Sequence, residues 1–291
     1  MASLSAAQVA QFHHDGVLLA EGVLTSEDLQ PVIDGYTRWL DERAIELGIS
    51  DLARELPFEK RFARLREQNR DIEKGMDVMN ARLPEFFTFL HNNNLLDAVS
   101  QLLDTNELTI NPIQHIRGKV TDDSSSSYFN VPWHQDAAVT WEEADDTPII
   151  TCWIPLVDAT VENGCMEILP DVWKQGVLRH IAGGGGATID PAVLPDSQAI
   201  RGAVKKGGIV FMHRCTPHRS TPNSTDTTRW SLDLRYQPNG LPTGRPFHPE
   251  FVARSPEKPA SVCSSYTEWA RRWEEALAAP PPARGAHRIS M

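Results

Sequence analysis

The sequence lacks the features that mark secreted and membrane-spanning proteins. Its four cysteines include no Cys-x-x-Cys pair. Residues 1–18 have no early basic residue, and polar side chains interrupt their apolar stretch, so they do not resemble a signal peptide. No apolar run reaches the roughly 18 residues that a membrane-spanning helix requires. We therefore expect reduced cysteines, no membrane contact and a cytoplasmic location.

Basic residues are also scarce. The chain has 28 Lys and Arg against 39 Asp and Glu, which gives a formal net charge of −11. This balance argues against non-specific binding to nucleic acids or anionic membranes, and it favours a small molecule as the partner. It does not exclude an anionic substrate, because one local basic pocket would suffice. The sequence leaves open whether the chain acts as a homodimer.

The remaining composition is that of an ordinary globular protein. The chain has 291 residues, 41% of them hydrophobic, which is enough for a sizeable core. We expect one domain, 1–291, in three parts. Residues 1–105 show mainly helical patterns, residues 106–240 are rich in short β-type runs, and residues 241–291 contain a further helix and a tail. Ser5 and Thr25 are the expected N-caps of the first two helices.

The short β-type runs alternate with turn signals, a spacing typical of an antiparallel sandwich or barrel. They are Leu108–Ile110, Ile113–Val120, Pro148–Leu156, Cys165–Leu169, Ile209–His213 and Arg229–Gln237. Two insertions interrupt them. Residues 121–130 contain four consecutive serines and are expected to be mobile, and residues 181–200 are expected to form a long loop, which is either a lid or a surface excursion.

Candidate metal ligands come in two parts of the chain. His134 and Asp136 flank Gln135, and His218 follows much later, with Arg229 eleven residues beyond it. Two imidazoles and one carboxylate can hold Fe(II) on one face and leave the other face open to O2 and a co-substrate. The His-x-Asp triplet alone is a weak signal, since such triplets also arise by chance.

The run that starts at Arg229 alternates between polar and large apolar side chains. Its polar set is Arg229, Ser231, Asp233 and Arg235. In an ordinary sandwich this polar face would meet solvent, whereas in a barrel with an internal site it can face the ligand. We favour the second interpretation, because a dicarboxylate co-substrate would explain a cation at Arg229.

Three motifs occur together in one order. They are Trp-His-Gln-Asp at 133–136, Asp-Ala-Thr-x-Glu-Asn-Gly at 158–164, and His-x-Ser-x-x-Asn at 218–223 followed by Arg229. This pattern resembles the phytanoyl-CoA dioxygenase family of Fe(II)/2-oxoglutarate oxygenases. The resemblance covers most of the chain. Its spacing favours His218 as the distal histidine over the competitors His213, His180 and His248.

The resemblance implies a mainly β, α+β fold: a double-stranded β-helix (a jelly-roll, cupin-like core) with N-terminal and flanking helices. It implies iron ligation by His134, Asp136 and His218. It also implies that Arg229 and Ser220 bind the C5 carboxylate of 2-oxoglutarate. The implied cofactors are Fe(II), 2-oxoglutarate as co-substrate, and O2.

Three further residues are weaker candidates for the co-substrate pocket. Lys119 either contacts 2-oxoglutarate or is an exposed strand lysine. Thr151 and Trp153 share a strand face and are expected to line the pocket, with plain core as the alternative for Trp153. Candidate pocket residues for the primary substrate are Met76, Tyr128, Phe129 and Trp141, against ordinary packing for each.

The function expected from the resemblance is a dioxygenase that oxidises a small or medium-sized metabolite and converts 2-oxoglutarate to succinate and CO2. Hydroxylation is favoured over desaturation, epoxidation or rearrangement. Related halogenases carry Gly or Ala where Asp136 stands, so chlorination is not expected. No convincing basic patch for coenzyme A is seen. The alternatives are a non-catalytic metal- or ligand-binding jelly-roll module and a cupin-like metal-dependent isomerase or hydrolase.

Overall fold

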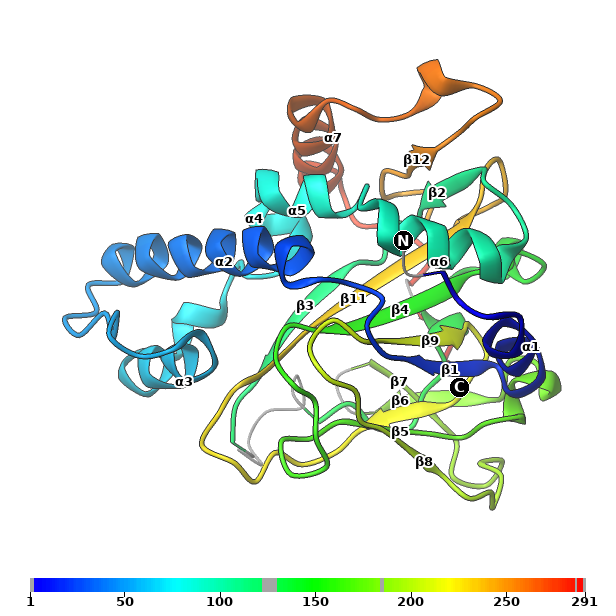
Figure 1. Ribbon diagram of the computed structural model, residues 1–291, viewed down its shortest axis with the longest axis horizontal. Helices are drawn as coiled ribbons and strands as arrows, with labels where there is room; N and C mark the ends of the chain where they lie inside the picture. Colours follow the sequence, from blue (N-terminus) through cyan, green and yellow to red (C-terminus); the bar gives the residue numbers. More distant parts are fainter. Residues whose placement is uncertain (1–2, 122–129, 184–185, 286, 290–291) are drawn as a thin grey trace.

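A seven-stranded antiparallel sheet forms the centre of the computed structural model, which describes residues 3–121, 130–183, 186–285 and 287–289 (Figure 1). Its strand order is β1-β9-β4-β11-β2-β12. β3 also pairs with β11, on the edge opposite β4 and next to β2. The strands are β1 (Val17–Ala20), β2 (Leu108–Ile110), β3 (His115–Lys119), β4 (Ile150–Pro155), β9 (Ile209–His213), β11 (Arg229–Pro238) and β12 (Phe251–Arg254). The β-type runs expected in this sheet are confirmed.

Two smaller antiparallel sheets complete the β structure. One has the order β10 (His218–Ser220), β5 (Met166–Ile168), β8 (Ile200–Gly202), and the other pairs β6 (His180–Gly183) with β7 (Gly186–Ile189). The expected long loop at 181–200 is therefore wrong in part, because it contains most of a hairpin and the start of β8. β5 lies within the expected run Cys165–Leu169, whereas β6, β7 and β8 have only three or four residues each, so their alternation was too weak to predict them.

The helices begin and end close to the expected positions. The Ser5 and Thr25 side chains form capping boxes with Gln8 and Asp28, which satisfy backbone N–H groups at the helix starts. The α-helices are α1 (Ala6–Asp15), α2 (Ser26–Glu46), α3 (Phe58–Gln68), α4 (Val78–Ala81), α5 (Pro84–Phe89), α6 (Asn93–Leu103) and α7 (Tyr266–Ala278). The 3-10 helices are η1 (Arg70–Glu73), η2 (Asp136–Val139), η3 (Glu142–Ala144), η4 (Val172–Gln175) and η5 (Pro259–Ser261).

The helices cover one face of the large sheet, and the smaller strands lie across its other face (Figure 1). The alternation in β11 explains this division. Trp230, Leu232, Leu234 and Tyr236 point into the main hydrophobic core together with helical side chains. Phe58 of α3 stacks on Trp230 with ring centroids 4.8 Å apart. Each such large side chain contributes about 1.5–3 kcal/mol on burial. The polar side chains of β11 are thereby turned toward the smaller sheets.

Residues 122–129, which make up most of the serine-rich insertion and include Tyr128 and Phe129, lie outside the described residues. Across the described part of the chain, no helix has both the length and the apolar character needed to cross a bilayer.

Candidate metal centre and its cavity

A cavity of about 460 Å³ lies between the polar face of the large sheet and the three-stranded sheet. Strands β3, β4 and β11 line it from one side, and β5 and β10 from the other. The polar residues that line it are His115, Arg117, Lys119, His134, Asp136, His218, Arg219, Ser220, Arg229, Asp233, Arg235, Arg245 and His287. The interpretation of β11 as a strand whose polar face meets a ligand cavity is consistent with this placement.

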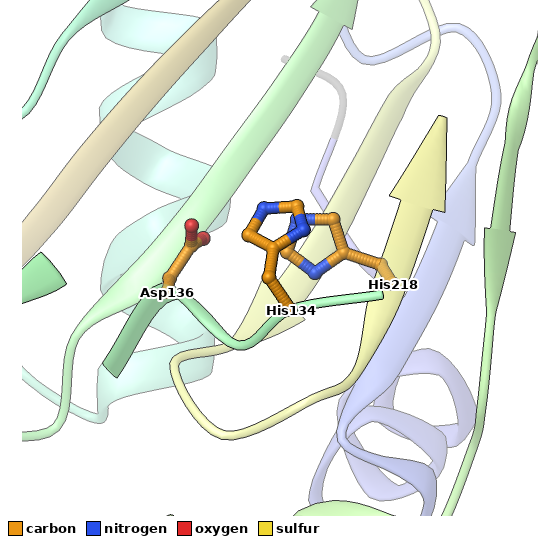
Figure 2. Close-up of side chains that lie close together, drawn as sticks. All are labelled: His134, Asp136 and His218. Carbon is orange, nitrogen blue, oxygen red and sulfur yellow. The ribbon is translucent and has the colours of Figure 1, made fainter. Parts of the chain in front are cut away.

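His134, Asp136 and His218 meet inside this cavity (Figure 2). One possible ligand atom from each lies within 4.8 Å of the others, and the two imidazole centroids are 4.1 Å apart. A backbone bridge brings the segments together: each histidine N–H donates to the other's carbonyl at 3.0 Å. The bridge places His134 beside the start of β10, and Asp136 follows at the start of η2. The three residues can therefore hold one metal ion.

Both histidines are oriented by carbonyl groups. His134 Nδ1 lies 2.9 Å from the Pro132 carbonyl oxygen, and His218 Nδ1 lies 3.0 Å from that of Thr216. Since a carbonyl can only accept, each Nδ1 carries the proton and each Nε2 keeps a lone pair for a metal. Burial, with the neighbouring His218, lowers the pKa of His134 to about 3. His134 is thus neutral at physiological pH, as a metal ligand must be.

Asp136 is held by two donors on separate oxygens. The Arg235 guanidinium donates to Oδ1 and the Thr151 hydroxyl donates to Oδ2. Burial by itself would raise the pKa of this carboxyl, but the charge of Arg235, the neighbouring His218 and His134 and the hydrogen bond from Arg235 together outweigh burial and hold the pKa well below its usual range. Asp136 is therefore an oriented carboxylate even without a metal ion.

Arg229 enters the cavity from the start of β11. Its guanidinium lies over the Trp153 ring, 5.0 Å from the centroid, and its Nε has no hydrogen-bond partner among the described residues. Arg229 is 5% exposed, and burial lowers its pKa to about 10, so it remains charged at neutral pH. A buried cation with an unsatisfied donor is costly unless a ligand supplies the acceptor. The arrangement suits an anionic ligand.

Lys119 lies opposite Arg229 in the β3–β11 register. It is 1% exposed, so the alternative of an exposed strand lysine is wrong. Its Nζ donates to Ser220 Oγ at 3.1 Å and to Asn130 Oδ1 at 2.6 Å. Lys119 and Ser220 therefore form a polar contact between the two sides of the cavity, next to Arg229.

A family model described as Phytanoyl-CoA dioxygenase (PhyH) matches residues 12–231. The chain belongs to the phytanoyl-CoA dioxygenase family. This membership makes it an enzyme of the dioxygenase class, as the sequence predicted. The present chain is 24% identical to phytanoyl-CoA dioxygenase domain-containing protein 1 of Bos taurus over 268 residues. These residues cover 79% of the present chain and 88% of the relative.

Solved structures of other non-haem enzymes share the fold. The apo form of the non-heme monooxygenase ThoJ has a TM-score of 0.64 at 18% identity, with 93% of this chain and 97% of ThoJ covered. The epimerase SnoN, solved with Fe3+, alpha ketoglutarate and nogalamycin RO, has a TM-score of 0.57 at 20% identity, with 82% and 86% covered. At these identities the likeness concerns the fold alone.

The competing histidines of this dioxygenase lie outside the three-residue cluster. His213 Nδ1 accepts the Cys215 N–H at 3.1 Å, and its ring packs against Trp173. His180 Nε2 accepts the Gln135 N–H at 3.2 Å, and His248 packs against Trp273. Each of these rings thus has a structural contact of its own, and the preference for His218 agrees with the geometry.

Met76 and Trp141 show ordinary packing, the alternative considered for each, and Thr151 was expected in the cavity lining but lies outside it. Met76 is 1% exposed within the hydrophobic core, because it packs among the helices. Trp141 is not among the cavity residues; its ring packs on Phe247 and its indole N–H donates to the Gly285 carbonyl. Thr151 is not among the cavity residues either. It is fully buried, and its hydroxyl donates to Asp136. Trp153 does line it, beneath Arg229.

Four arginines that line the cavity were given no role from the sequence: Arg117, Arg219, Arg235 and Arg245. Arg235 was recognised only as part of the polar alternation in β11, and its pairing with Asp136 depends on contacts 99 residues apart. Arg245 lies in the irregular segment between β11 and β12, where no periodicity marks a cavity residue. The alternation was a usable signal for Arg235, whereas Arg245 had none.

Proposed function

We propose that this family member is an Fe(II)- and 2-oxoglutarate-dependent dioxygenase that hydroxylates a small or medium-sized metabolite. One observation carries the proposal: three potential metal ligands and a buried arginine with an unsatisfied Nε line the same cavity. Two histidines and one carboxylate leave positions open on Fe(II). A dicarboxylate can fill two of these positions with one end and bind an arginine with the other.

His134, Asp136 and His218 would hold the iron. The donor set suits it, because it combines two imidazoles whose Nε2 atoms are free to coordinate with one ionised carboxylate. Arg235 and Thr151 would keep the carboxylate in place as outer partners of the metal site. The site is thus preorganised by hydrogen bonds that exist before any metal binds.

Arg229 would bind the C5 carboxylate of 2-oxoglutarate. Its planar guanidinium can donate two parallel hydrogen bonds to a carboxylate, and the face of Trp153 supports it from below. Ser220 and Lys119 line the same cavity, where either can donate to the bound co-substrate. The unsatisfied Nε of Arg229 would then gain an acceptor.

When bound, iron and 2-oxoglutarate supply oxidation by O2, with release of succinate and CO2. The chain's own residues contribute position and a dry environment. Arg229 and the three ligands fix the co-substrate at both ends, and Ile113, Val139 and Met166 add apolar surface that limits access of water. The carboxylate of Asp136 argues against halogenation. Hydroxylation is the favoured outcome, and desaturation, epoxidation and rearrangement by the same oxidant are alternatives that product analysis would distinguish.

The proposal also includes the type of β core, the domain organisation and the location expected from the sequence. The seven-stranded and three-stranded sheets on either side of the cavity support a double-stranded β-helix as the core. A single oxygenase domain over 1–291 and a cytoplasmic location stay predictions, and the oligomeric state stays open.

The decisive experiment measures succinate in the presence and absence of O2, with Fe(II) and 2-oxoglutarate supplied to the full chain and a metabolite library added. We expect succinate only when O2, Fe(II) and 2-oxoglutarate are all present, with a stimulated rate for true substrates. Turnover of a metabolite without O2 would instead favour the cupin-like isomerase or hydrolase. Metal and 2-oxoglutarate binding with no succinate under any condition would favour the non-catalytic module.

A further inference from the structure

The cavity contains a second arginine whose charge the proposed function does not use. Arg245 lines the cavity from the segment after β11. Its Nε donates to the Val139 carbonyl at 2.5 Å, and its guanidinium lies 5.4 Å from the centroid of the Phe247 ring. Arg245 forms no ion pair with any Asp or Glu of the described chain. Its remaining donors are available to a ligand.

The backbone around Arg245 is fixed by the chain itself. Gly244 adopts a φ of +70°, and a Cβ there would lie 2.5 Å from the Thr140 Cβ, so only glycine fits this close approach. The Gly244 carbonyl accepts the Trp141 N–H at 2.9 Å, and the Arg245 N–H donates to Thr243 Oγ1 at 3.2 Å. Arg245 is therefore held in the cavity by a rigid turn, as a preorganised binding residue would be.

The charged groups that surround Arg245 in the described part of the chain offer it no compensation. Arg235 is engaged with Asp136, and the nearby rings of His248 and His287 carry no negative charge. Burial, with Arg235, lowers the pKa of Arg245 to about 10, which still leaves it protonated at neutral pH. A cation in such surroundings is stabilised most directly by an anion that enters from solution.

The cavity as a whole is basic within an acidic protein. Among the described residues, its charged lining has two acids, Asp136 and Asp233, against the basic side chains Arg117, Lys119, Arg219, Arg229, Arg235 and Arg245. Arg219 is neutralised by Glu167, and Arg235 by Asp136. Asp233 acts on Arg229 through space. Since the chain carries a net charge of −11, this local excess of positive charge is concentrated where a ligand would bind.

Arg229 and Arg245 lie toward different ends of the cavity. Arg229 is at the start of β11 beside Lys119, whereas Arg245 lies near Arg235, which is six residues further along the same strand. Six residues of strand span roughly 20 Å. A 2-oxoglutarate molecule held between Arg229 and the metal ligands would leave Arg245 for a second anion.

We propose that Arg245 binds an oxyanion group of the primary substrate, so that the substrate is a small carboxylate or phosphonate. The inference rests on the proposed function, because it assigns the co-substrate to Arg229. The tail residue His287 lies at the same end of the cavity and can add a hydrogen bond. A volume of about 460 Å³ is near the lower end for ligand sites, which favours a compact substrate once the co-substrate is in place.

The test measures binding directly. The full chain is loaded anaerobically with Mn(II) and 2-oxoglutarate, and a panel of small aliphatic and aromatic monocarboxylates and alkylphosphonates is titrated by calorimetry. Each acid is compared with its neutral primary amide or dialkyl ester. We expect at least one acid to bind at least about tenfold more tightly than its neutral partner. The carboxylate and phosphonate arms distinguish the two sources of the oxyanion.

Variants then locate the interaction. We expect Arg245→Gln to weaken binding of that acid at least about tenfold, and Arg245→Lys to weaken it less, while the affinity for 2-oxoglutarate stays within about twofold. Arg284→Gln is the matched control, because it removes the same charge from the nearby tail outside the cavity lining. Retained 2-oxoglutarate binding also shows that each variant is folded.

Three results would overturn the inference. The first is a panel in which no acid binds more tightly than its neutral partner. The second is an unchanged acid affinity in Arg245→Gln. The third is a loss of 2-oxoglutarate binding in Arg245→Gln with none in Arg229→Ala, which would make Arg245 the co-substrate residue and would also refute the role proposed for Arg229. If only the inference about Arg245 fails, 2-oxoglutarate still binds and its binding still depends on Arg229. Failure of the proposed function would instead abolish this dependence.

Discussion

Arg235 forms a buried ion pair with Asp136, the carboxylate of the three-residue cluster. Their side chains are 6% and 4% exposed. The second carboxylate oxygen accepts from Thr151, so both oxygens have a donor. A buried ion pair of this kind adds little net stability compared with apolar residues, but loss of one partner leaves an uncompensated charge.

Replacement of Arg235 tests this dependence. We expect Arg235→Met to lower the free energy of unfolding of the metal-free protein by about 3–5 kcal/mol, because it leaves the Asp136 carboxylate buried without a counter-charge. Urea denaturation at neutral pH measures the loss. Arg271→Met is the control, since Arg271 makes comparable ion pairs with Glu268 and Glu275 on the exposed face of α7. Equal losses in both variants would contradict the importance of the buried pair.

The choice of distal histidine can be tested by metal binding. We expect His218→Ala to weaken Mn(II) binding at least about 100-fold, because the loss of a direct ligand should exceed the 10- to 100-fold effect of outer partners. Anaerobic calorimetry on the metal-free chain gives the affinity. His213→Ala should bind Mn(II) like the unmodified protein, since His213 lies outside the cluster. The assignment fails should the two variants behave in the opposite way.

Arg229 can be tested through the affinity for 2-oxoglutarate. We expect Arg229→Ala to raise the dissociation constant of 2-oxoglutarate about 10- to 100-fold, as the loss of charge-assisted hydrogen bonds does, with little change in metal affinity. The visible absorption band of the anaerobic Fe(II)–2-oxoglutarate complex reports the titration. Arg219→Ala is the comparison, because Arg219 also lines the cavity but is paired with Glu167. An unchanged affinity in Arg229→Ala would exclude its proposed role.

Gly164, at the end of the Asp-Ala-Thr-x-Glu-Asn-Gly motif, should not tolerate a side chain. Its φ is +86°, and a Cβ would lie 2.7 Å from the Thr221 carbonyl oxygen and 3.0 Å from Lys119 Cε. Gly22 also has a positive φ, +66°, but a Cβ at Gly22 would have no neighbouring atom of the described residues within 4 Å. We expect Gly22→Ala to cost about 1 kcal/mol from backbone strain alone, and Gly164→Ala to cost clearly more. Thermal or urea unfolding of the pair separates close contact from strain.

Stability should fall as the pH drops below neutral. Burial lowers the pKa of His213 and of His248 to about 4, from an ordinary value of 6.5, with Arg214 and Arg245 as the next causes. Between pH 6.5 and pH 4 the unfolded chain therefore binds more protons at these sites than the folded chain, so acid favours unfolding. The upper limit is about 1.4 kcal/mol per pH unit for each histidine. We expect His213→Gln to reduce the slope of unfolding free energy against pH; an unchanged slope would contradict the assignment.

Several features could be predicted from local sequence because they depend on neighbours in the chain. The capping residues Ser5 and Thr25 begin helices as predicted, since a side-chain oxygen three residues before a free N–H is a local relationship. The alternation in β11 separated its core face from its cavity face, because strand side chains alternate. Family motifs singled out His218, although the positions of His213 and His180 in space were needed to see what those rings contact.

Other features depended on contacts between distant segments. Thr151 was expected to line the pocket, but sheet register brings its hydroxyl to Asp136. Met76 was a candidate for the pocket, but helix packing buries it in the core. The hairpin of β6 and β7 was not predicted, because its strands are stabilised by each other and lack a strong pattern of their own.

The sequence by itself determined the kinds of chemical groups present, the periodic faces of the helices and strands, and the order of the family motifs, since these follow from short-range sterics and side-chain spacing. Only the tertiary structure decided which charges are paired. It joined Arg235 to Asp136, left Arg245 without an acid partner among the described residues, and set Lys119 opposite Arg229. The physical reason is that electrostatic interactions depend on distance in space and on burial, and both are fixed by sheet register and packing between residues far apart in the chain.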